Sequence, residues 1–420
     1  MRIHTRLLAV MTLLLCLAAL LCACSVSDVK DKVDSVKGEV DAVKDKVGAV
    51  KDEIKDKVSN LITTTSAPPT TTAVTTEAPP SPGMQYQKGS DGRSYTVRGY
   101  AGKLTDLVIA EENNGFPVTS IMQGAFKGKK NLTSIRIPDS VTSIGKGAFN
   151  GCDGMIRTDG GAKYVDRWVV GLGALDAMAT LRADTVGIAD AAFEGCSQLV
   201  SITLSESLRH IGKDAFLGCT SLSTIVVPEA NTAFCVVGDA LYTKDMTRLI
   251  RYFGKDKSFT VPATVTEIAS SAFRDQKTLT SITFEEGSAL VTLGEYAFSG
   301  CTSLTAFTIP SGVKRISNGA FSGCTSLATF AYPLDSVCAA IGAEAFRGCS
   351  ALTSIRILTD MTEIGQNAFY ECTSLGAVHF AVTEGWRAGD QDVPKTVVYA
   401  SAQAATALKD TYHIKTWVRD

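Results

Sequence analysis

The stretch GAFSGCTSL at residues 319–327 decides the fold, because a near copy, YAFSGCTSL, occupies residues 296–304. The Ala-Phe pair recurs along the chain, and six of the eight steps between successive Phe residues are 23 or 25 residues long. A phrase that returns at a fixed interval indicates one structural unit built many times. The anchors are Phe126, Phe149, Phe193, Phe216, Phe273, Phe298, Phe321, Phe346 and Phe369.

The residues around each anchor follow one pattern. A phrase of the form V-x-x-I-G-x-x-A precedes most Phe residues, as in VTSIGKGAF (141–149). Cys follows three positions after seven of the nine Phe residues, and an apolar residue follows six positions after every one. An alternating run such as LTSIRIP (132–138) comes next, which predicts a short strand ended by Pro. The A-F-x-G-C segment between them predicts a tight turn or about one helical turn.

A unit of this size cannot bury its own apolar face. Stacked units place Phe on Phe, Leu on Leu and Ile on Ile, and so predict a continuous core. Two steps are longer, at 44 and 57 residues, and each contains extra strand-like runs. These runs are YVDRWVVG with ATLRAD, and CVVGDALYT with TRLIRYF. We interpret the two long steps as repeats elongated by a hairpin.

The phrase V-x-x-I-G-x-x-A-F-x-x-C-x-x-L-x-x-I-x-I-P resembles the BspA-like leucine-rich repeat family of bacterial surface proteins, over about residues 96–393. The resemblance implies an α/β leucine-rich repeat solenoid of short parallel strands with turns or short helices. We assign it to residues 84–393 and a terminal cap to residues 394–420. Departures are local: Lys129 and Gln276 replace the Cys in two repeats, and the strand after Met155 is degenerate.

Residues 1–23 predict a bacterial lipoprotein signal peptide, in which a short basic segment precedes an apolar run. Leu21-Cys22-Ala23-Cys24 resembles a lipobox, which predicts lipidation of Cys24. Two or more acyl chains give stable anchoring, where a single chain would be marginal. The predicted location is therefore the outer face of the bacterial cell membrane, exposed at the surface. An uncleaved anchor helix and an ordinary signal cut are the alternatives.

Two segments of unusual composition follow the predicted lipid. Residues 24–62 place apolar residues at alternating steps of four and three, a heptad pattern that predicts a helical stalk. The stalk is interpreted either as a coiled coil that makes an oligomer or as a single solvated helix. Residues 63–83 are rich in Thr and Pro, which predicts a disordered, extended linker.

The cysteines favour packing over cross-linking. Seven of the twelve occupy one repeat position that faces the core, where a thiol behaves as a small hydrophobe. Disulfides between neighbouring coils are the alternative, because strand spacing lies within reach of a disulfide. Cys235 and Cys338 lie outside this position, and we expect them to be the better candidates for free thiols.

Other motifs give no support for catalysis. The sequence has no H-E-x-x-H, no G-x-S-x-G and no C-x-x-C, so we expect no enzyme activity, no metal and no cofactor. The net charge is −2 and no basic cluster stands out, which argues against nucleic acid as a partner.

The phrase L-x-x-I-x-I offers a surface, because its x positions point outward when Leu and Ile point inward. In register, these positions form a face of small hydroxyls with two Arg and one His, which we expect to be a concave docking surface. The alternative is that Ser and Thr simply suit exposed strands. Candidate partner-binding residues are Arg136, Thr203, Thr283, Thr308, Arg356 and His379.

The inserted hairpins are the second candidate site. They carry Trp168, Tyr242 and Tyr252, which are aromatic types favoured at binding hot spots. The alternative is that these rings cover the small core of their own hairpins.

The order of lipid, stalk, spacer and head predicts a cell-surface binding protein, an adhesin or a recognition module. The resemblance implies host or neighbouring-cell surface proteins or glycans as partners. A structural, self-associating envelope lipoprotein is one alternative, which the heptads favour. A non-catalytic helper that captures a polymer for an enzyme complex is the other.

Overall fold

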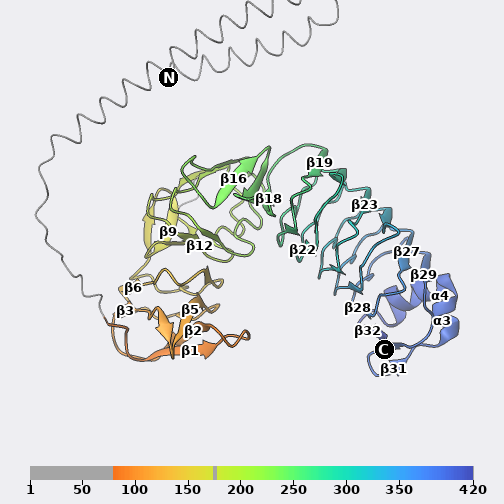
Figure 1. The fold of residues 1–420 in the computed structure, drawn as a ribbon, viewed down its shortest axis with the longest axis horizontal. Helices are drawn as coiled ribbons and strands as arrows, with labels where there is room; N and C mark the ends of the chain where they lie inside the picture. Colours follow the sequence, from red (N-terminus) through yellow and green to blue (C-terminus); the bar gives the residue numbers. More distant parts are fainter. Residues whose placement is uncertain (1–78, 174–176, 420) are drawn as a thin grey trace, which may run out of the picture. The chain divides into compact units, whose positions relative to one another are not determined.

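The computed structural model describes residues 79–173 and 177–419, which belong to one compact unit (Figure 1). The predicted signal peptide, the lipidation site Cys24, the stalk and most of the linker lie outside the described residues. Residues 79–83, assigned above to the linker, instead pack on the head. Ser81 is 8% exposed and exchanges two hydrogen bonds with Val108, each 2.9 Å long.

Most coils of the solenoid contribute one strand to each of two sets. The first set, the L-strands, comes from the L-x-x-I-x-I phrase, and neighbouring members pair in parallel. The prediction of short parallel strands is confirmed. The L-strands are β3 (Asp106–Val108), β6 (Ser134–Arg136), β11 (Met178–Thr180), β13 (Ser201–Thr203), β15 (Thr224–Val226), β19 (Ser258–Val261), β21 (Ser281–Phe284), β23 (Ala306–Thr308), β25 (Thr329–Ala331), β27 (Ser354–Ile357) and β29 (Ala377–Phe380).

The second set, the V-strands, comes from the V-x-x-I phrase. Most V-strands are two residues long and pair in parallel with the next coil. A turn carrying the A-F-x-G-C segment returns the chain to the next L-strand. The V-strands are β5 (Phe116–Ile121), β7 (Ser143–Ile144), β12 (Gly187–Ile188), β14 (His210–Ile211), β20 (Glu267–Ile268), β22 (Thr292–Leu293), β24 (Arg315–Ile316), β26 (Ala340–Ile341) and β28 (Glu363–Ile364).

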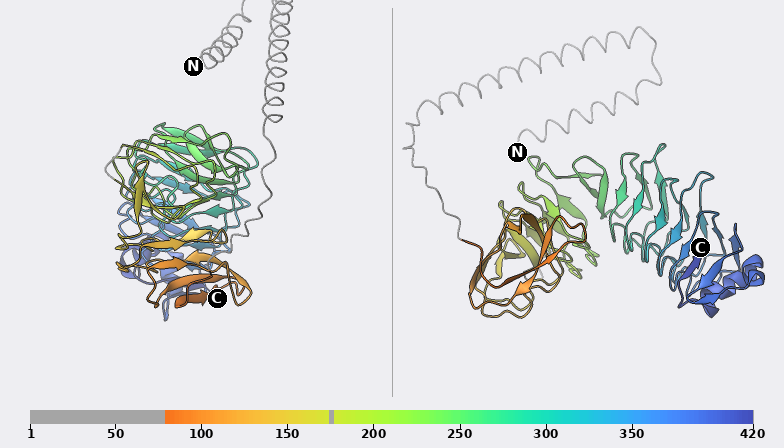
Figure 2. Two further views of the ribbon diagram at one scale, coloured as in Figure 1. Left: turned by 90° about the vertical axis from the view of Figure 1, so that its left-hand side faces the viewer. Right: turned by 60° about the horizontal axis from the view of Figure 1, so that its bottom comes forward.

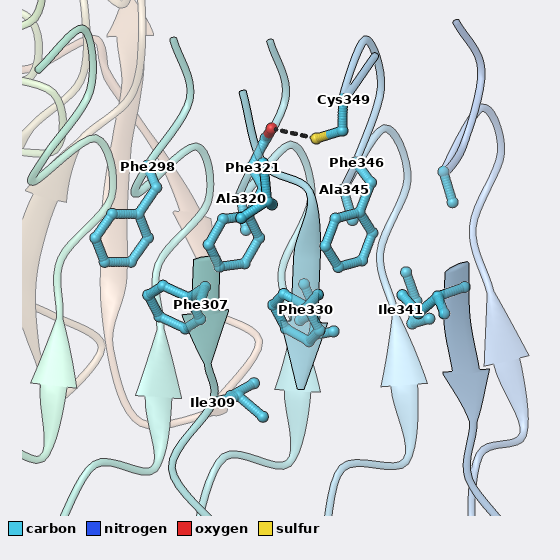
Figure 3. Packing of buried hydrophobic residues seen from close by; sticks show 14 of the residues in the cluster. Phe298, Phe307, Ile309, Ala320, Phe321, Phe330, Ile341, Ala345, Phe346 and Cys349 are labelled. Carbon is cyan, nitrogen blue, oxygen red and sulfur yellow. Dashed lines mark hydrogen bonds between the residues drawn. The ribbon is translucent and has the colours of Figure 1, made fainter. Parts of the chain in front are cut away.

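The turn depends on two left-handed residues and a stacked ring. The residues two before and two after each Phe have positive φ in all nine coils, between 54° and 77°. Six Phe pairs stack nearly parallel, with ring centroids 4.9–5.6 Å apart. Figure 3 shows Phe298, Phe321 and Phe346 in one row, above Phe307 and Phe330. The turn therefore supplies both the change of direction and the centre of the core.

The cysteines at the shared repeat position bond to the backbone and not to each other. Six of the seven donate an Sγ–H hydrogen bond of 2.9–3.1 Å to the carbonyl of the Phe in the preceding coil, as Cys349 does to Phe321 in Figure 3. Gln276, which replaces Cys, makes the equivalent bond from Nε2 to the carbonyl of Tyr252 at 3.0 Å. All nine cysteines in the described residues are free thiols.

Cys338 is a free thiol, as predicted, but it is buried. It is 0% exposed, because it occupies the position of the inward Val in its V-x-x-I phrase. Cys235, by contrast, is only partly buried.

The two long steps contain the predicted hairpins. In the first, β8 (Arg157–Asp159), β9 (Ala162–Val165) and β10 (Trp168–Leu172) form an antiparallel meander; in the second, β16 (Phe234–Val237), β17 (Ala240–Thr243) and β18 (Arg248–Tyr252) do so. The last strand of each meander then pairs in parallel with the next V-strand. The ATLRAD run is not part of a hairpin: it lies on L-strand β11, which pairs with β13.

The core is divided at the second insertion, where a continuous core was expected. One buried cluster extends from Val97 to Phe253 and the other from Ala240 to Trp417. Strands β17 and β18 contribute buried side chains to both clusters, because neighbouring residues of a strand point to opposite sides. Arg251 contributes to the separation: it replaces the Ala that precedes every Phe anchor and remains 6% exposed, donating from Nη1 to the Ser271 carbonyl at 2.8 Å.

Both ends of the solenoid are covered. At the start, the hairpin of β1 (Met84–Lys88) and β2 (Tyr95–Tyr100) pairs through β2 with β5, which β4 (Glu112–Asn113) also joins. At the end, β32 (Trp417–Arg419) pairs antiparallel with β28 and with β30 (Trp386–Ala388), beside β31 (Gln391–Asp392). Helical segments α3 (Lys395–Tyr399), α4 (Ser401–Thr406) and the π-helix η1 (Ala407–Thr411) complete the cap and lie at the end of the stack (Figure 2). The cap thus also uses residues 386–392, ahead of the predicted boundary at residue 394.

The L-strands do not form a concave face. In Figure 1, β19, β23 and β27 follow the outer side of the curve that residues 258–380 describe, and β22 and β28 follow its inner side. Pairing agrees with this placement: β21 and β23 share one register pair, Ser281 with Ala306, and β25 does not pair with β27. An outer surface has a longer path, so its strands splay. No helix in the described part of the chain is long and apolar enough to cross a membrane.

The left-handed turn positions predict opposite effects for two substitutions. Gly195 has φ +73°, and a Cβ added there would meet no atom within 4 Å, so Gly195→Ala tests conformation alone. We expect it to lower the free energy of unfolding by about 1–2 kcal/mol. Ala191 has φ 54°, and Ala191→Gly should raise stability by up to about 1 kcal/mol. Urea unfolding followed by circular dichroism measures both, and a neutral Gly195→Ala would contradict the assignment.

Thiol reactivity tests the packing of the cysteines. Burial raises the pKa of Cys219, Cys301 and Cys372 to about 12, so at pH 8 almost none of each is thiolate. Among the nine thiols described, we expect only the partly buried Cys196 and Cys235 to react quickly with an aromatic disulfide reagent. Peptide mass spectrometry before and after denaturation identifies the labelled sites. Rapid native labelling of Cys324 or Cys349 would contradict this packing.

Candidate functional site

The predicted outward residues of the L-strands are on the surface. In β6, Ile135 is buried while Ser134 and Arg136 are exposed, and this alternation recurs in the other coils. Thr283, Thr308, Arg356 and His379 are exposed, and Thr203 is half-buried. The prediction that these side chains face solvent is confirmed.

The face is divided, however, into separate sheets. The L-strands form four groups: β3 with β6; β11, β13 and β15; β19 to β25; and β27 with β29. Arg136 and Arg356 lie on the first and last groups, so the two arginines do not act on one site. Arg356 and His379 are register neighbours in β27 and β29. Thr283 and Thr308 share the four-stranded group, the longest uninterrupted part of the face.

A groove of about 580 Å³ lies on this four-stranded group. Thr283 and Thr308 line it, together with the half-buried Phe284, Pro310 and Pro333 and the exposed Asp335. The Thr283 hydroxyl lies 2.9 Å from that of Thr260 on β19, which fixes one wall. Phe284 packs edge-on against Phe307, with ring centroids 5.8 Å apart. Two of the predicted residues therefore contribute to one concave, largely apolar site.

The groove follows from the lengths of the loops that leave the L-strands. In most coils this loop has three residues, as at 310–312 and 358–360, whereas the loops at 285–289 and 333–337 have five. The two long loops flank the short one, whose Pro310 and Ser311 form the base between them. In the sequence, the signal for these loops is the spacing of 25, 23 and 25 residues between the Phe anchors from Phe273 to Phe346.

The aromatic residues of the insertions are buried, so the prediction that they contact a partner is wrong. Trp168, Tyr242 and Tyr252 are each 1% exposed. Trp168 stacks on His210 across Gly187, with ring centroids 5.8 Å apart. Tyr252 takes the place of a Phe anchor and stacks on Phe273 at 5.3 Å. The alternative interpretation, that these rings form the core of the insertions, describes the structure.

The face carries mainly hydroxyl and apolar side chains. Across residues 79–173 and 177–419, no group of three or more His, Cys, Asp or Glu residues could hold a metal ion. Asp106 shows what the hydroxyls do elsewhere: hydrogen bonds from Ser134, Thr133 and Thr105 lower the pKa of its carboxyl. The groove offers hydroxyls, apolar side chains and nearby carboxylates, which suit recognition by contact and hydrogen bonding.

The stacked coils and their exposed L-strands define a leucine-rich repeat solenoid. The family model described as BspA type leucine rich repeat region matches residues 101–161, 177–236 and 252–381, which is more than half of the chain. The chain belongs to this family. No curated protein sequence matches the chain.

Several solved structures are similar to this chain. A leucine rich cell surface protein from Faecalibacterium prausnitzii A2-165 is 21% identical, with a TM-score of 0.46, 72% of this chain covered and 94% of that one. The pneumococcal vaccine antigen PcpA is 20% identical, with a TM-score of 0.44 and coverage of 78% and 95%. A leucine-rich repeat protein from Bacteroides ovatus ATCC 8483 is 22% identical, with a TM-score of 0.33 and coverage of 70% and 86%.

Proposed function

We propose that this protein is an exported, surface-exposed binding protein, held at the cell membrane by lipid on Cys24, whose solenoid head recognises protein or glycan partners. The groove on β21 and β23, between the two long loops, is the observation that carries the proposal. It is the part of the face where exposed hydroxyls, half-buried rings and a concave shape coincide. Ligand sites in proteins are typically concave and mostly apolar, with a few polar groups that fix orientation.

The extended layout of the N-terminal sequence supports the same role. A lipid at Cys24, a heptad stalk over 24–62 and a Thr/Pro spacer would hold the head away from the membrane. Membership of a leucine-rich repeat family agrees with recognition, because solenoids present extended surfaces to partners. The heptads also favour a second candidate function, self-association of an envelope lipoprotein.

Binding by the full chain to a panel of matrix proteins, mucins and cell-surface polysaccharides tests the proposal. We expect saturable binding to at least one member. Thr283→Tyr with Thr308→Tyr should weaken this binding at least tenfold, because two aromatic rings would fill the groove. Tyr is favoured in strands, so the variant should still fold. The matched control is Thr224→Tyr at an exposed position of β15, outside the groove, which should leave binding unchanged.

Two results would contradict the proposal. Binding that survives the double Tyr variant would place the site elsewhere, for example at Arg356 and His379 on the last sheet. Absence of binding to every panel member, from a chain that self-associates in light scattering, would favour the structural alternative.

A further inference from the structure

The rim of the groove has a net negative charge. Glu285 and Glu286 on one long loop and Asp335 on the other are exposed, and the residues that line the groove include no Lys or Arg. Glu285 accepts a hydrogen bond from the Ala263 backbone N–H at 2.8 Å, which holds its carboxylate beside the β19–β21 side of the face. Within the described residues, Glu286 and Asp335 have no ion-pair partner. Glu286 and Asp335 therefore remain available to a cation from outside, and Glu285 adds a third negative charge nearby.

The apolar part of the groove lies next to these charges. Phe284, Pro310 and Pro333 are half-buried and line it, while Leu334 at its edge is fully exposed, with a relative exposure of 105%. Covering Leu334 with a partner would contribute a favourable free energy of about 25 cal/mol for each Å² of apolar surface buried. The hydroxyls of Thr283, Thr308 and Ser311 can satisfy polar backbone groups of that partner.

We propose that the groove binds an extended, basic segment of a partner protein, with Lys or Arg beside an aliphatic side chain. The inference rests on the proposed function and specifies the partner's chemistry. The aliphatic side chain lies on Phe284 and the two prolines, and the cation faces the carboxylates of Glu286 and Asp335. Each exposed ion pair contributes little on its own, about 0–1 kcal/mol. Three carboxylates on one rim add long-range attraction, which salt screens.

A pair of matched peptides tests this proposal with the full chain. The probes are the fluorescein-labelled, capped heptapeptide Ser-Lys-Val-Ser-Lys-Val-Ser and its counterpart with Glu in place of Lys. We expect fluorescence anisotropy to show binding of the Lys peptide at least tenfold tighter than of the Glu peptide. Raising NaCl from 50 to 500 mM should weaken the Lys peptide's binding.

Charge reversal makes the test specific to this site. Glu286→Lys with Asp335→Lys should reverse the preference, so that the Glu peptide binds more tightly. Both positions are exposed loop residues, and far-UV circular dichroism checks that the fold is kept. Asp360→Lys, in the exposed three-residue loop of the next coil, is the matched control and should leave the preference unchanged.

Several outcomes overturn the inference. Equal binding of the two peptides, no binding of either, or the same reversal from Asp360→Lys would each do so. A panel polysaccharide whose binding is lost in the Thr283→Tyr, Thr308→Tyr variant, combined with no peptide binding, would leave the proposed function standing. In that case the groove's partner would be a glycan and the peptide assignment would be wrong.

Discussion

The turn around each Phe anchor is the constraint on which this structure depends. Two left-handed residues reverse the chain within five positions, the ring stacks on the ring of the next coil, and the Cys thiol donates to the carbonyl of the previous Phe. A coil that loses one of these contacts exposes apolar surface on both neighbours, because each coil is buried only by stacking. The short strands on either side add parallel pairing but need the turn to set their register.

Departures from the repeat keep the contacts while changing the residues. Tyr252 stacks on Phe273 where a Phe would, and Gln276 donates where Cys would, so the stack begins again at the end of the second insertion. Strands β17 and β18 take the place of a regular coil. Some of their buried side chains pack in the first cluster and the others pack in the second. This arrangement buries Arg251 at an Ala position with one hydrogen bond, to the Ser271 carbonyl, and burying its charge is unfavourable. The insertion therefore joins two packed halves without ending the solenoid.

Much of the fold was predictable from the sequence, and part of the site was not. Spacing and alternation identified the strands, the turn, the inward Phe and Cys, and the outward Thr283 and Thr308, because these follow from local periodicity. Composition could not tell that Trp168, Tyr242 and Tyr252 point inward, since a hairpin has two faces and the sequence does not say which is covered. The expected concavity of the L-strand face was also wrong, because curvature depends on packing across the whole coil. The groove depends on two extra residues in each of two loops, a difference in length that no residue type marks.

The repeat builds the scaffold, and variation in loop length shapes the groove that we propose as the binding site. The most direct measurement shortens both long loops to three residues, by deleting Gly287 with Ser288 and Ser336 with Val337, which leaves every carboxylate in place. We expect the shortened protein to unfold at a midpoint within a few degrees of the original and to lose binding of the partner of the L-strand face. Unchanged binding by a folded, loop-shortened protein would contradict this division of roles.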